Sequence, residues 1–236
     1  MKVFAHRGAS GLAPENTIAA IELALSYPID GVEIDVYPLE DDYIIIHDRW
    51  LTRTAGLNKR LDQISLNEAR STQVGSYQGI PQFIPLLSEV LALNWGNKLL
   101  NIELKSLHCP KHFLAYLDKH VNATKQLEPQ DIVISAFNHH YLSAVRQHTA
   151  LYPLGWLTAS NDLTYAQQAK QQHSNSINID MDVVNKAIVD DAHQRGLQVN
   201  IFTVDELADI DLLLDYKVDG VFTNRPDVIS KYLSQD

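Results

Sequence analysis

Short β-branched apolar runs alternate with helix-like segments along almost the whole chain, and this alternation limits the fold more than any other feature. Eight such runs are each followed by a segment whose apolar residues recur at helical spacing. Runs that are apolar at nearly every position are typical of parallel strands covered on both faces. We expect the eight strands at residues Lys2–His6, Gly31–Val36, Lys98–Leu104, Asp131–Phe137, Tyr152–Thr158, Ile177–Asp180, Gln198–Thr203 and Asp219–Thr223.

Eight strand–helix units in 236 residues predict an α/β protein with a closed (β/α)8 TIM barrel, a fold that typically needs about 250 residues. A doubly wound open sheet is the alternative, but the segment after the first strand, residues 6–11, is not the G-x-G-x-x-G turn of dinucleotide-binding sheets. Tyr43–Ile46 is a further short strand, and residues 49–83 have no regular period. We therefore predict one domain over residues 1–236, with a small insertion at about residues 48–83, after the second strand.

The composition excludes several classes of partner. The chain has 19 Lys and Arg against 29 Asp and Glu, a net charge of −10, so it has no global electrostatic attraction for nucleic acid or an anionic membrane. No apolar run approaches the roughly 20 residues of a membrane span, and no signal-peptide stretch is present at the start. The single cysteine, Cys109, excludes an internal disulfide framework. We expect a cytoplasmic protein with no stable membrane insertion, and the oligomeric state stays open.

Three carboxylates mark a candidate metal site. The C-terminal ends of the strands build the active site of a barrel. Glu33 and Asp35 are two residues apart on one strand and so share a face, and Glu103 ends the next barrel strand. Converging carboxylates repel one another, and one divalent cation that prefers oxygen ligands, Mg²⁺ or Ca²⁺, would relieve that repulsion. The alternative is a set of structural ion pairs with Arg7 and Lys105, although buried charges are costly unless they are paired or bound to metal.

Two cations and two histidines stand beside these carboxylates. Arg7 follows the first strand, and Lys105 shares a strand face with Glu103. Cations next to an anionic metal site suit an oxyanion, most simply a phosphate. His6 and His47 would flank the cluster, and histidine is the commonest general acid or base. A lone buried histidine is more often a packed core residue than a catalyst.

A set of short motifs occurs in a fixed order along the chain. They are His6-Arg7-Gly8, Pro14-Glu15-Asn16-Thr17, Glu33-x-Asp35, His47-Asp48, Arg53-Thr54, Asn101-Ile102-Glu103-Leu104-Lys105, Ser135-Ala136-Phe137, Phe202-Thr203-Val204 and Asp219-Gly220-Val221-Phe222-Thr223-Asn224-Arg225-Pro226. Each motif alone is weak, but the ordered set is specific, and it resembles the glycerophosphodiester phosphodiesterase family over nearly the whole chain. The resemblance is to the short, cytoplasmic bacterial members.

The resemblance implies a (β/α)8 barrel and the metal-dependent hydrolysis of small glycerophosphodiesters to sn-glycerol 3-phosphate and an alcohol. By the same resemblance, His6 and His47 are the acid–base pair. The other implied roles are phosphate contacts for Arg7 and Lys105, and metal ligands for Glu33, Asp35 and Glu103. Four points stay open: the preferred alcohol, the choice of Mg²⁺ or Ca²⁺, which histidine is the acid, and whether water or a glycerol hydroxyl attacks first.

Three other functions are compatible with these residues. A lysophospholipase-D-like activity would use the same side chains on a lipid and would need an apolar entry, for which Trp50, Ile80 and Phe83 are candidates. A barrel lyase or isomerase acting on a phosphorylated sugar would need a proton-abstracting group beside a carbonyl. A non-catalytic phosphodiester-binding protein would not need both His6 and His47.

Overall fold

A computed structural model describes residues 1–234 of the chain. Its strands are β1 (Lys2–His6), β2 (Gly31–Leu39), β3 (Asp42–Ile45), β4 (Gln73–Tyr77), β5 (Ile80–Phe83), β6 (Leu99–Leu104), β7 (Ile132–Ala136), β8 (Leu154–Thr158), β9 (Ser176–Asp180), β10 (Gln198–Phe202) and β11 (Gly220–Thr223). Its α-helices are α1 (Ile18–Leu25), α2 (Thr52–Ala55), α3 (Leu66–Ser71), α4 (Leu87–Leu91), α5 (Pro110–Thr124), α6 (His139–Arg146), α7 (Gln167–Gln171), α8 (Lys186–Gln194), α9 (Leu207–Tyr216) and α10 (Pro226–Leu233). Two 3₁₀ turns, η1 (Leu61–Gln63) and η2 (Pro129–Asp131), complete the set.

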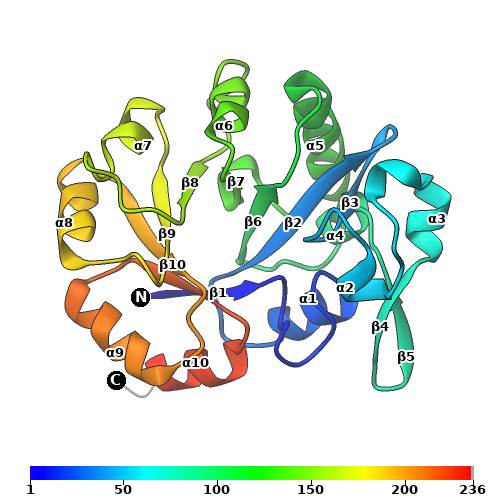
Figure 1. Cartoon of the computed structure of the whole chain (residues 1–236), viewed down its shortest axis with the longest axis horizontal. Coiled ribbons are helices and arrows are strands. Elements are labelled where there is room, and N and C mark those ends of the chain that lie inside the picture. Colours follow the sequence, from blue (N-terminus) through cyan, green and yellow to red (C-terminus); the bar gives the residue numbers. More distant parts are fainter. Residues whose placement is uncertain (235–236) are drawn as a thin grey trace.

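Eight of these strands form a closed parallel barrel in the order β1, β2, β6, β7, β8, β9, β10 and β11. Strand β1 pairs in parallel with both β2 and β11, and this double pairing closes the sheet. The helices lie outside the ring of strands (Figure 1). The predicted (β/α)8 barrel is confirmed, and the open doubly wound sheet is excluded.

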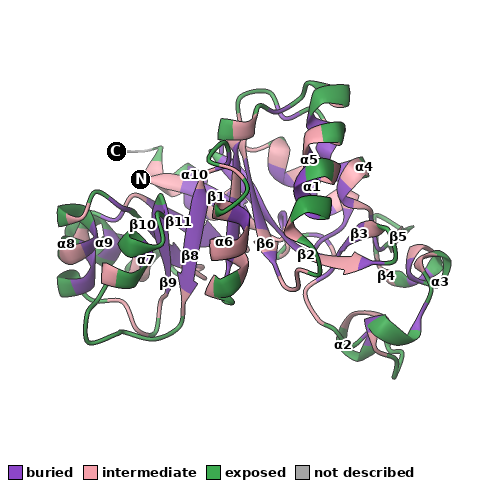
Figure 2. Cartoon of the chain, turned by 90° about the horizontal axis from the view of Figure 1, so that it is seen from above, coloured by how far each residue is buried: buried purple, intermediate pink, exposed green. Residues whose placement is uncertain are grey.

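The predicted insertion lies beside the barrel rather than within its wall. It contains α2, η1, α3 and the β4–β5 hairpin, and it projects on the side of β2 and β3 (Figure 2). Antiparallel pairing with β3 lengthens β2 to Leu39, beyond the predicted end at Val36. The insertion packs on a small apolar cluster of its own, which includes Ile44, Leu51 and Ile84.

Two helices near the ends of strands are short and sharply bounded. Helix α4 has only five residues, Leu87–Leu91. Helix α8 starts at Lys186, because the Asn185 side chain accepts a hydrogen bond from the Ile188 amide at 3.1 Å and so caps the helix there.

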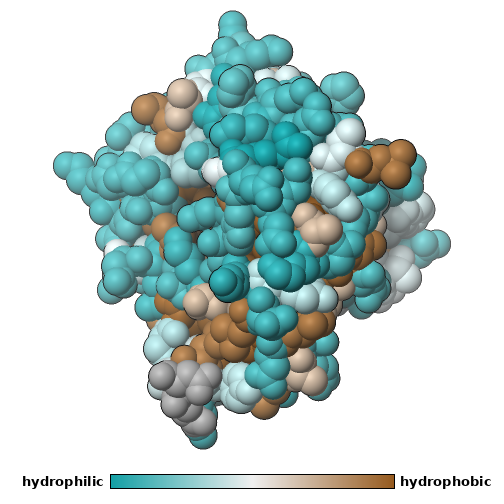
Figure 3. All heavy atoms as spheres, turned by 90° about the vertical axis from the view of Figure 1, so that its left-hand side faces the viewer, coloured by the Kyte–Doolittle hydropathy of each residue, from teal (hydrophilic) through white to brown (hydrophobic). Residues whose placement is uncertain are grey.

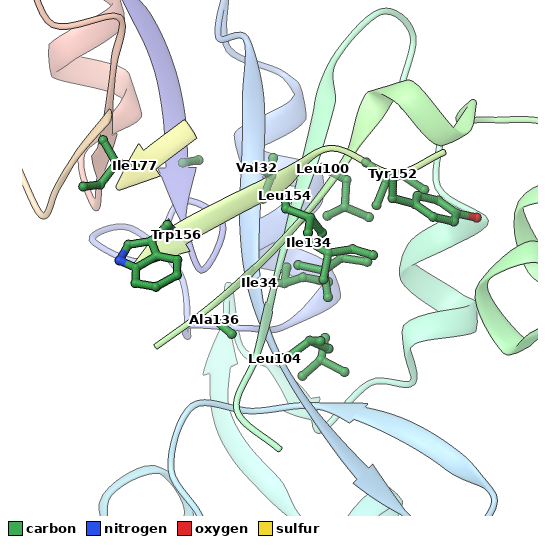
Figure 4. Packing of buried hydrophobic residues seen from close by; sticks show 14 of the residues in the cluster. Val32, Ile34, Leu100, Leu104, Ile134, Ala136, Tyr152, Leu154, Trp156 and Ile177 are labelled. Carbon is green, nitrogen blue, oxygen red and sulfur yellow. The ribbon is translucent and has the colours of Figure 1, made fainter. Parts of the chain in front are cut away.

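The main core lies between the barrel wall and its helices. Side chains that alternate along β2, β6, β7 and β8 point outward and pack together, as the labelled residues in Figure 4 show. Ile34, Ile102 and Ile134 are fully buried there. Burying an aliphatic side chain of this size contributes about 1.5–3 kcal/mol, so this layer holds the strand ends that carry the site in place.

The barrel interior is unusually polar at mid-height, where the inward residues include Asn101, Asn178 and Asn200, all almost fully buried. The buried Phe4 ring lines the same small cavity as these three asparagines. A Cβ on Gly31 would lie 2.7 Å from that ring, so this position of β2 requires glycine. The inward faces of the strands therefore present polar side chains, while the outward faces present the apolar side chains that pack against the helices.

The outer surface is mainly hydrophilic on the side formed by α7 and α8, and hydrophobic side chains gather toward α9 (Figure 3). Helix α9 has three exposed leucines, Leu207, Leu212 and Leu214. Among the described residues, no helix has both the length and the apolar character that a membrane crossing needs.

Candidate active site

Three carboxylates converge at the C-terminal mouth of the barrel. Glu33 and Asp35 point inward from β2, and Glu103 points inward from the neighbouring β6, where it pairs in register with Asp35. Each offers an oxygen, and these three oxygens lie within 4.8 Å of one another. Glu33 and Asp35 are 4% and 1% exposed, so the charges are held close together and away from water.

The electrostatics of this cluster are unfavourable without a further cation. Burial, followed by the charges of Asp35 and Glu103, raises the pKa of Glu33 well above its usual range. Burial and the Asp35 charge raise the pKa of Glu103 to about 7. Glu33 Oε1 and Asp35 Oδ1 are buried and accept no hydrogen bond. Unused carboxylate oxygens that face one another fit a hard divalent cation.

Two cationic side chains border the cluster. Arg7 approaches Asp35 with its Nε 3.3 Å from Oδ2, and its backbone amide donates to Glu33 Oε2 at 2.9 Å. Lys105 donates from Nζ to Glu103 Oε1 at 2.7 Å and lies 3.4 Å from Asp35 Oδ1. Burial by itself would lower the pKa of Lys105, but the neighbouring carboxylates raise it above its ordinary value.

The turn after β1 explains how Arg7 reaches the cluster. Arg7 and Gly8 both have positive φ, 57° and 77°, which turns the chain back over the barrel mouth. A Cβ on Gly8 would lie 2.6 Å from the Ala20 carbonyl carbon, so helix α1 packs directly on this turn. Glycine at position 8 therefore allows both the turn and the close helix.

His6 is the last residue of β1, and residues from the other end of the chain fix its ring. Its Nδ1 lies 2.9 Å from Asn224 Oδ1, and the Asn224 amide nitrogen donates to Asp205 Oδ2 at 2.7 Å. Burial and the Arg7 charge lower the pKa of His6. The Asp205 carboxylate can only accept, so the Asn224 oxygen must face His6, and His6 Nδ1 is the donor.

His47 follows β3 and has a different partner. Its Nδ1 lies 2.6 Å from Asp48 Oδ1, and Arg53 donates to the second Asp48 oxygen at 2.6 Å. Burial opposes ionisation of Asp48, but its bonds to Arg53 and His47 lower the pKa of Asp48. Arg53 also donates twice to Glu15, at 2.7 Å each. One ring nitrogen of each histidine is thus occupied by the protein.

An apolar wall made of Phe137, Leu157, Phe202 and Phe222 faces the polar side of the site. These four side chains and His6, Glu33, Asn101 and Glu103 line one small cavity of about 20 Å³. The Phe137 and Phe202 rings meet edge to face with their centroids 5.7 Å apart. The wall closes one side of the barrel mouth.

All seven side chains predicted from the sequence gather at this mouth. Four other polar residues do so as well: Asn16, Asp48, Asp205 and Asn224. Three of these four stand in the motifs noted above, but sequence reasoning assigned them no role. Their hydrogen-bond partners in the structure show what these side chains do. In the sequence, Asp205 belongs to no recognised motif and is marked only by its position after a strand.

Asn16 is the clearest of the missed residues. It is 3% exposed, its side-chain nitrogen donates to Asp35 Oδ2 at 2.8 Å, and its oxygen accepts from the Asp35 amide at 3.2 Å. Its φ of 57° lies in the left-handed region, where asparagine is one of the few non-glycine residues commonly found. Asn16 thereby orients Asp35 within the cluster.

We expect Asn16→Ala to lower the free energy of unfolding by about 1–3 kcal/mol, because it leaves a buried carboxylate oxygen and the buried backbone amide of Asp35 without a hydrogen-bond partner. Urea unfolding measures the change. Asn122→Ala, at an exposed position of α5, is the matched control and should shift stability by less than about 0.5 kcal/mol. Equal effects of the two substitutions would show that Asn16 does not support Asp35.

A family model described as the glycerophosphoryl diester phosphodiesterase family matches residues 6–228. The chain belongs to this family. The family predicted from the motifs is therefore confirmed, and so is the predicted enzyme class, a phosphodiesterase. The match runs from the last residue of β1 into α10 and includes the insertion.

Several similar proteins align with this chain along nearly its whole length. An uncharacterized protein of Bacillus subtilis is 31% identical over 255 residues, covering 100% of this chain and 99% of the relative. A glycerophosphodiester phosphodiesterase of the same organism is 29% identical and covers 96% of this chain and 84% of the relative. The structure of an Oleispira antarctica phosphodiesterase in complex with the product sn-glycerol-3-phosphate has 26% identity and a TM-score of 0.89, covering 99% of this chain and 97% of that one.

Proposed function

We propose that the chain hydrolyses glycerophosphodiesters to sn-glycerol 3-phosphate and an alcohol, with a divalent cation and His6 and His47 as the acid–base pair. The observation that carries the proposal is the cluster of three carboxylates, two of them buried, with oxygens within 4.8 Å of one another and bordered by Arg7 and Lys105. The product named with the Oleispira antarctica structure supports the same substrate class.

Glu33, Asp35 and Glu103 would hold the cation, Mg²⁺ or Ca²⁺, because each offers an oxygen within 4.8 Å of the other two, and Glu33 Oε1 and Asp35 Oδ1 have no hydrogen-bond donor. When bound, such an ion supplies Lewis-acid polarisation of a phosphoryl oxygen and orients the substrate. With the carboxylate charge balanced in this way, Arg7 and Lys105 are available to donate to the phosphoryl oxygens. Donors held in place before the reaction stabilise the negative charge that develops there.

The partners of the two histidines distinguish their roles. His6 Nδ1 donates to Asn224, and burial lowers the pKa of His6, so the neutral ring has its lone pair on Nε2 and can accept a proton; this makes His6 the general base. His47 Nδ1 lies 2.6 Å from Asp48 Oδ1, and a carboxylate in this position orients the ring and supports proton donation from it. We therefore assign proton donation to the leaving alcohol to His47.

The first nucleophile is either water or the glycerol hydroxyl next to the phosphate. The two routes differ in a product that can be measured. Attack by the hydroxyl gives a cyclic phosphate that water then opens, whereas direct attack by water gives none. Phosphorus NMR of an early time point distinguishes them.

A lipid substrate receives less support from the geometry. Ile80 and Phe83 are exposed at the β4–β5 hairpin, but the cavity that Phe83 lines contains none of the seven site residues. The Arg60 guanidinium lies over one face of the Trp50 ring, 5.8 Å from its centroid, and Trp50 is 38% exposed. A lysophospholipid assay tests this alternative directly, and turnover comparable with that of a water-soluble diester would favour it.

We also propose that the barrel and the insertion act as one domain. One apolar cluster extends from Val3 to Ile229, which supports this view for the barrel. The cytoplasmic location and the absence of stable membrane insertion stay predictions from the sequence.

The direct test is incubation with glycerophosphodiesters while released sn-glycerol 3-phosphate is measured, with and without a chelator. We expect turnover that needs added cation. The double variant His6→Ala, His47→Ala controls for contaminating enzymes. Absence of turnover on every head group in the presence of Mg²⁺ and Ca²⁺ would contradict the proposed function.

Arg7→Ala and Lys105→Ala should each lower kcat/KM by on the order of 10²-fold, because a donor to the developing phosphoryl charge is lost. Lys105→Arg should recover only part of the loss, since a planar fork replaces a compact charge. Lys111→Ala, at an exposed position of α5, is the control for loss of one positive charge. Wild-type kinetics in either site variant would reject the phosphate role.

A further inference from the structure

A second and larger cavity opens beside the candidate active site. It has a volume of about 310 Å³ and lies between the β2–β3 hairpin, the inserted segment and the chain that follows β6. Its polar lining includes Tyr37, Arg49, Arg60, Asp62, Ser106 and His108. We call it the insertion groove.

The groove adjoins the site through the backbone of three elements. Tyr37 lies two residues beyond Asp35 on β2, Arg49 two residues beyond His47, and Ser106 directly after Lys105. The opposite side of the mouth is closed by the apolar wall, where the cavity holds only about 20 Å³. A bulky group that leaves the phosphate next to His47 therefore finds room in the insertion groove.

The charges that line the groove are not equally available. Arg60 forms a two-point contact with Asp62, with both distances 2.7 Å, and Glu40 accepts from the Leu66 amide at 3.0 Å. Within residues 1–234, the exposed side chains of Arg49 and His108 have no hydrogen bond or ion pair. Asp62 is thus paired with Arg60, and Arg49 is the arginine of the groove, within residues 1–234, whose guanidinium forms no hydrogen bond or ion pair.

We propose that the insertion groove binds the leaving alcohol and that Arg49, with His108, favours an alcohol that carries an anionic group. This inference rests on the proposed function and specifies its substrate class. Arginine is suited to such recognition because its planar fork donates to a carboxylate or phosphate at two points. Recognition of a quaternary ammonium group commonly uses several aromatic faces, and among the described residues that line the groove Tyr37 is the one aromatic side chain.

Three synthetic diesters of sn-glycerol 3-phosphate test the proposal. Their alcohols are 3-hydroxypropanoate, which is anionic, propan-1-ol, which is neutral, and choline, which is cationic. The ratio of kcat/KM for the anionic diester to kcat/KM for the choline diester is the measured quantity. We expect Arg49→Gln to lower this ratio about tenfold, the scale of one charge-assisted hydrogen bond at an open site. Arg49→Glu should lower it further and invert the preference.

Two controls make the result specific. Lys119→Gln removes one positive charge from an exposed position of α5 and should leave the ratio unchanged. Arg49→Lys should keep part of the preference. If the wild type hydrolyses the diesters but the ratio is the same in Arg49→Gln, the assignment of the groove is overturned while the proposed function stands. If the wild type hydrolyses none of the three, the proposed function itself fails.

Discussion

Replacing His47 by alanine is expected to lower kcat for a glycerophosphodiester by about 10²- to 10⁴-fold, with little change in KM. The physical reason is that the leaving alkoxide loses its proton donor, an effect of about 3–6 kcal/mol on the transition state. His6→Ala should have a similar effect, because the nucleophile loses its base. Steady-state kinetics on the purified variants measures both, with circular dichroism to confirm that they are folded.

The nature of the leaving group distinguishes the two roles. A diester of p-nitrophenol needs little protonation as the phenolate departs, so it should restore much of the activity of His47→Ala and little of that of His6→Ala. His140→Ala, at an exposed position of α6, should behave as the wild type. The double variant should lose far less than the product of the two single losses, because the groups act as a unit. Equal rescue of both variants would refute the assignment of acid and base.

Removal of the divalent cation is the second change with a large expected effect. Chelation should abolish turnover, and Mg²⁺ or Ca²⁺ should restore it, because Arg7 and Lys105 alone leave the three converging carboxylates with an excess of negative charge. The cation binds only the native state, so saturating concentrations should also raise Tm. Calorimetry measures this rise without relying on activity. Full activity in a thoroughly chelated preparation would exclude the metal role.

Glu33→Gln separates metal binding from folding. The amide oxygen of the substituted side chain can still accept a hydrogen bond from the Arg7 backbone amide. The substitution also removes one of the three carboxylate charges that repel one another. In the metal-free state this variant should be at least as stable as the wild type, yet it should show little metal-dependent rise in Tm. Glu22→Gln, at an exposed position of α1, is the matched control and should keep the full rise.

The same cluster sets a pH dependence. Burial and the neighbouring charges raise the pKa of Glu33, and that of Glu103 to about 7, so the metal-free folded state binds more protons than the unfolded chain. Metal-free stability should therefore fall as the pH rises from about 5 through 7. A cation needs the ionised carboxylates, so the metal-dependent rise in Tm should be larger at about pH 8 than at about pH 5.5. A rise that is larger at the acidic pH would contradict this account.

Much of the fold could be predicted because it depends on local periodicity. The outward residues Val32, Ile34 and Val36 alternate with the inward Glu33 and Asp35, and this period of two identifies both the strand and its polar face. Element boundaries were less accurate. The end of β2 depends on its partner β3, and the start of α8 depends on a cap that only Asn185 supplies.

The sequence by itself determined the barrel, the family and the seven side chains at its mouth, because strand alternation and ordered motifs are local in the chain. The tertiary structure alone decided what each of them contacts. His6 and Asn224 are 218 positions apart, and the direction of their hydrogen bond depends on Asp205, which arrives from a third segment. Barrel closure between β1 and β11 brings these segments together, and no local pattern encodes which ring nitrogen then carries the proton.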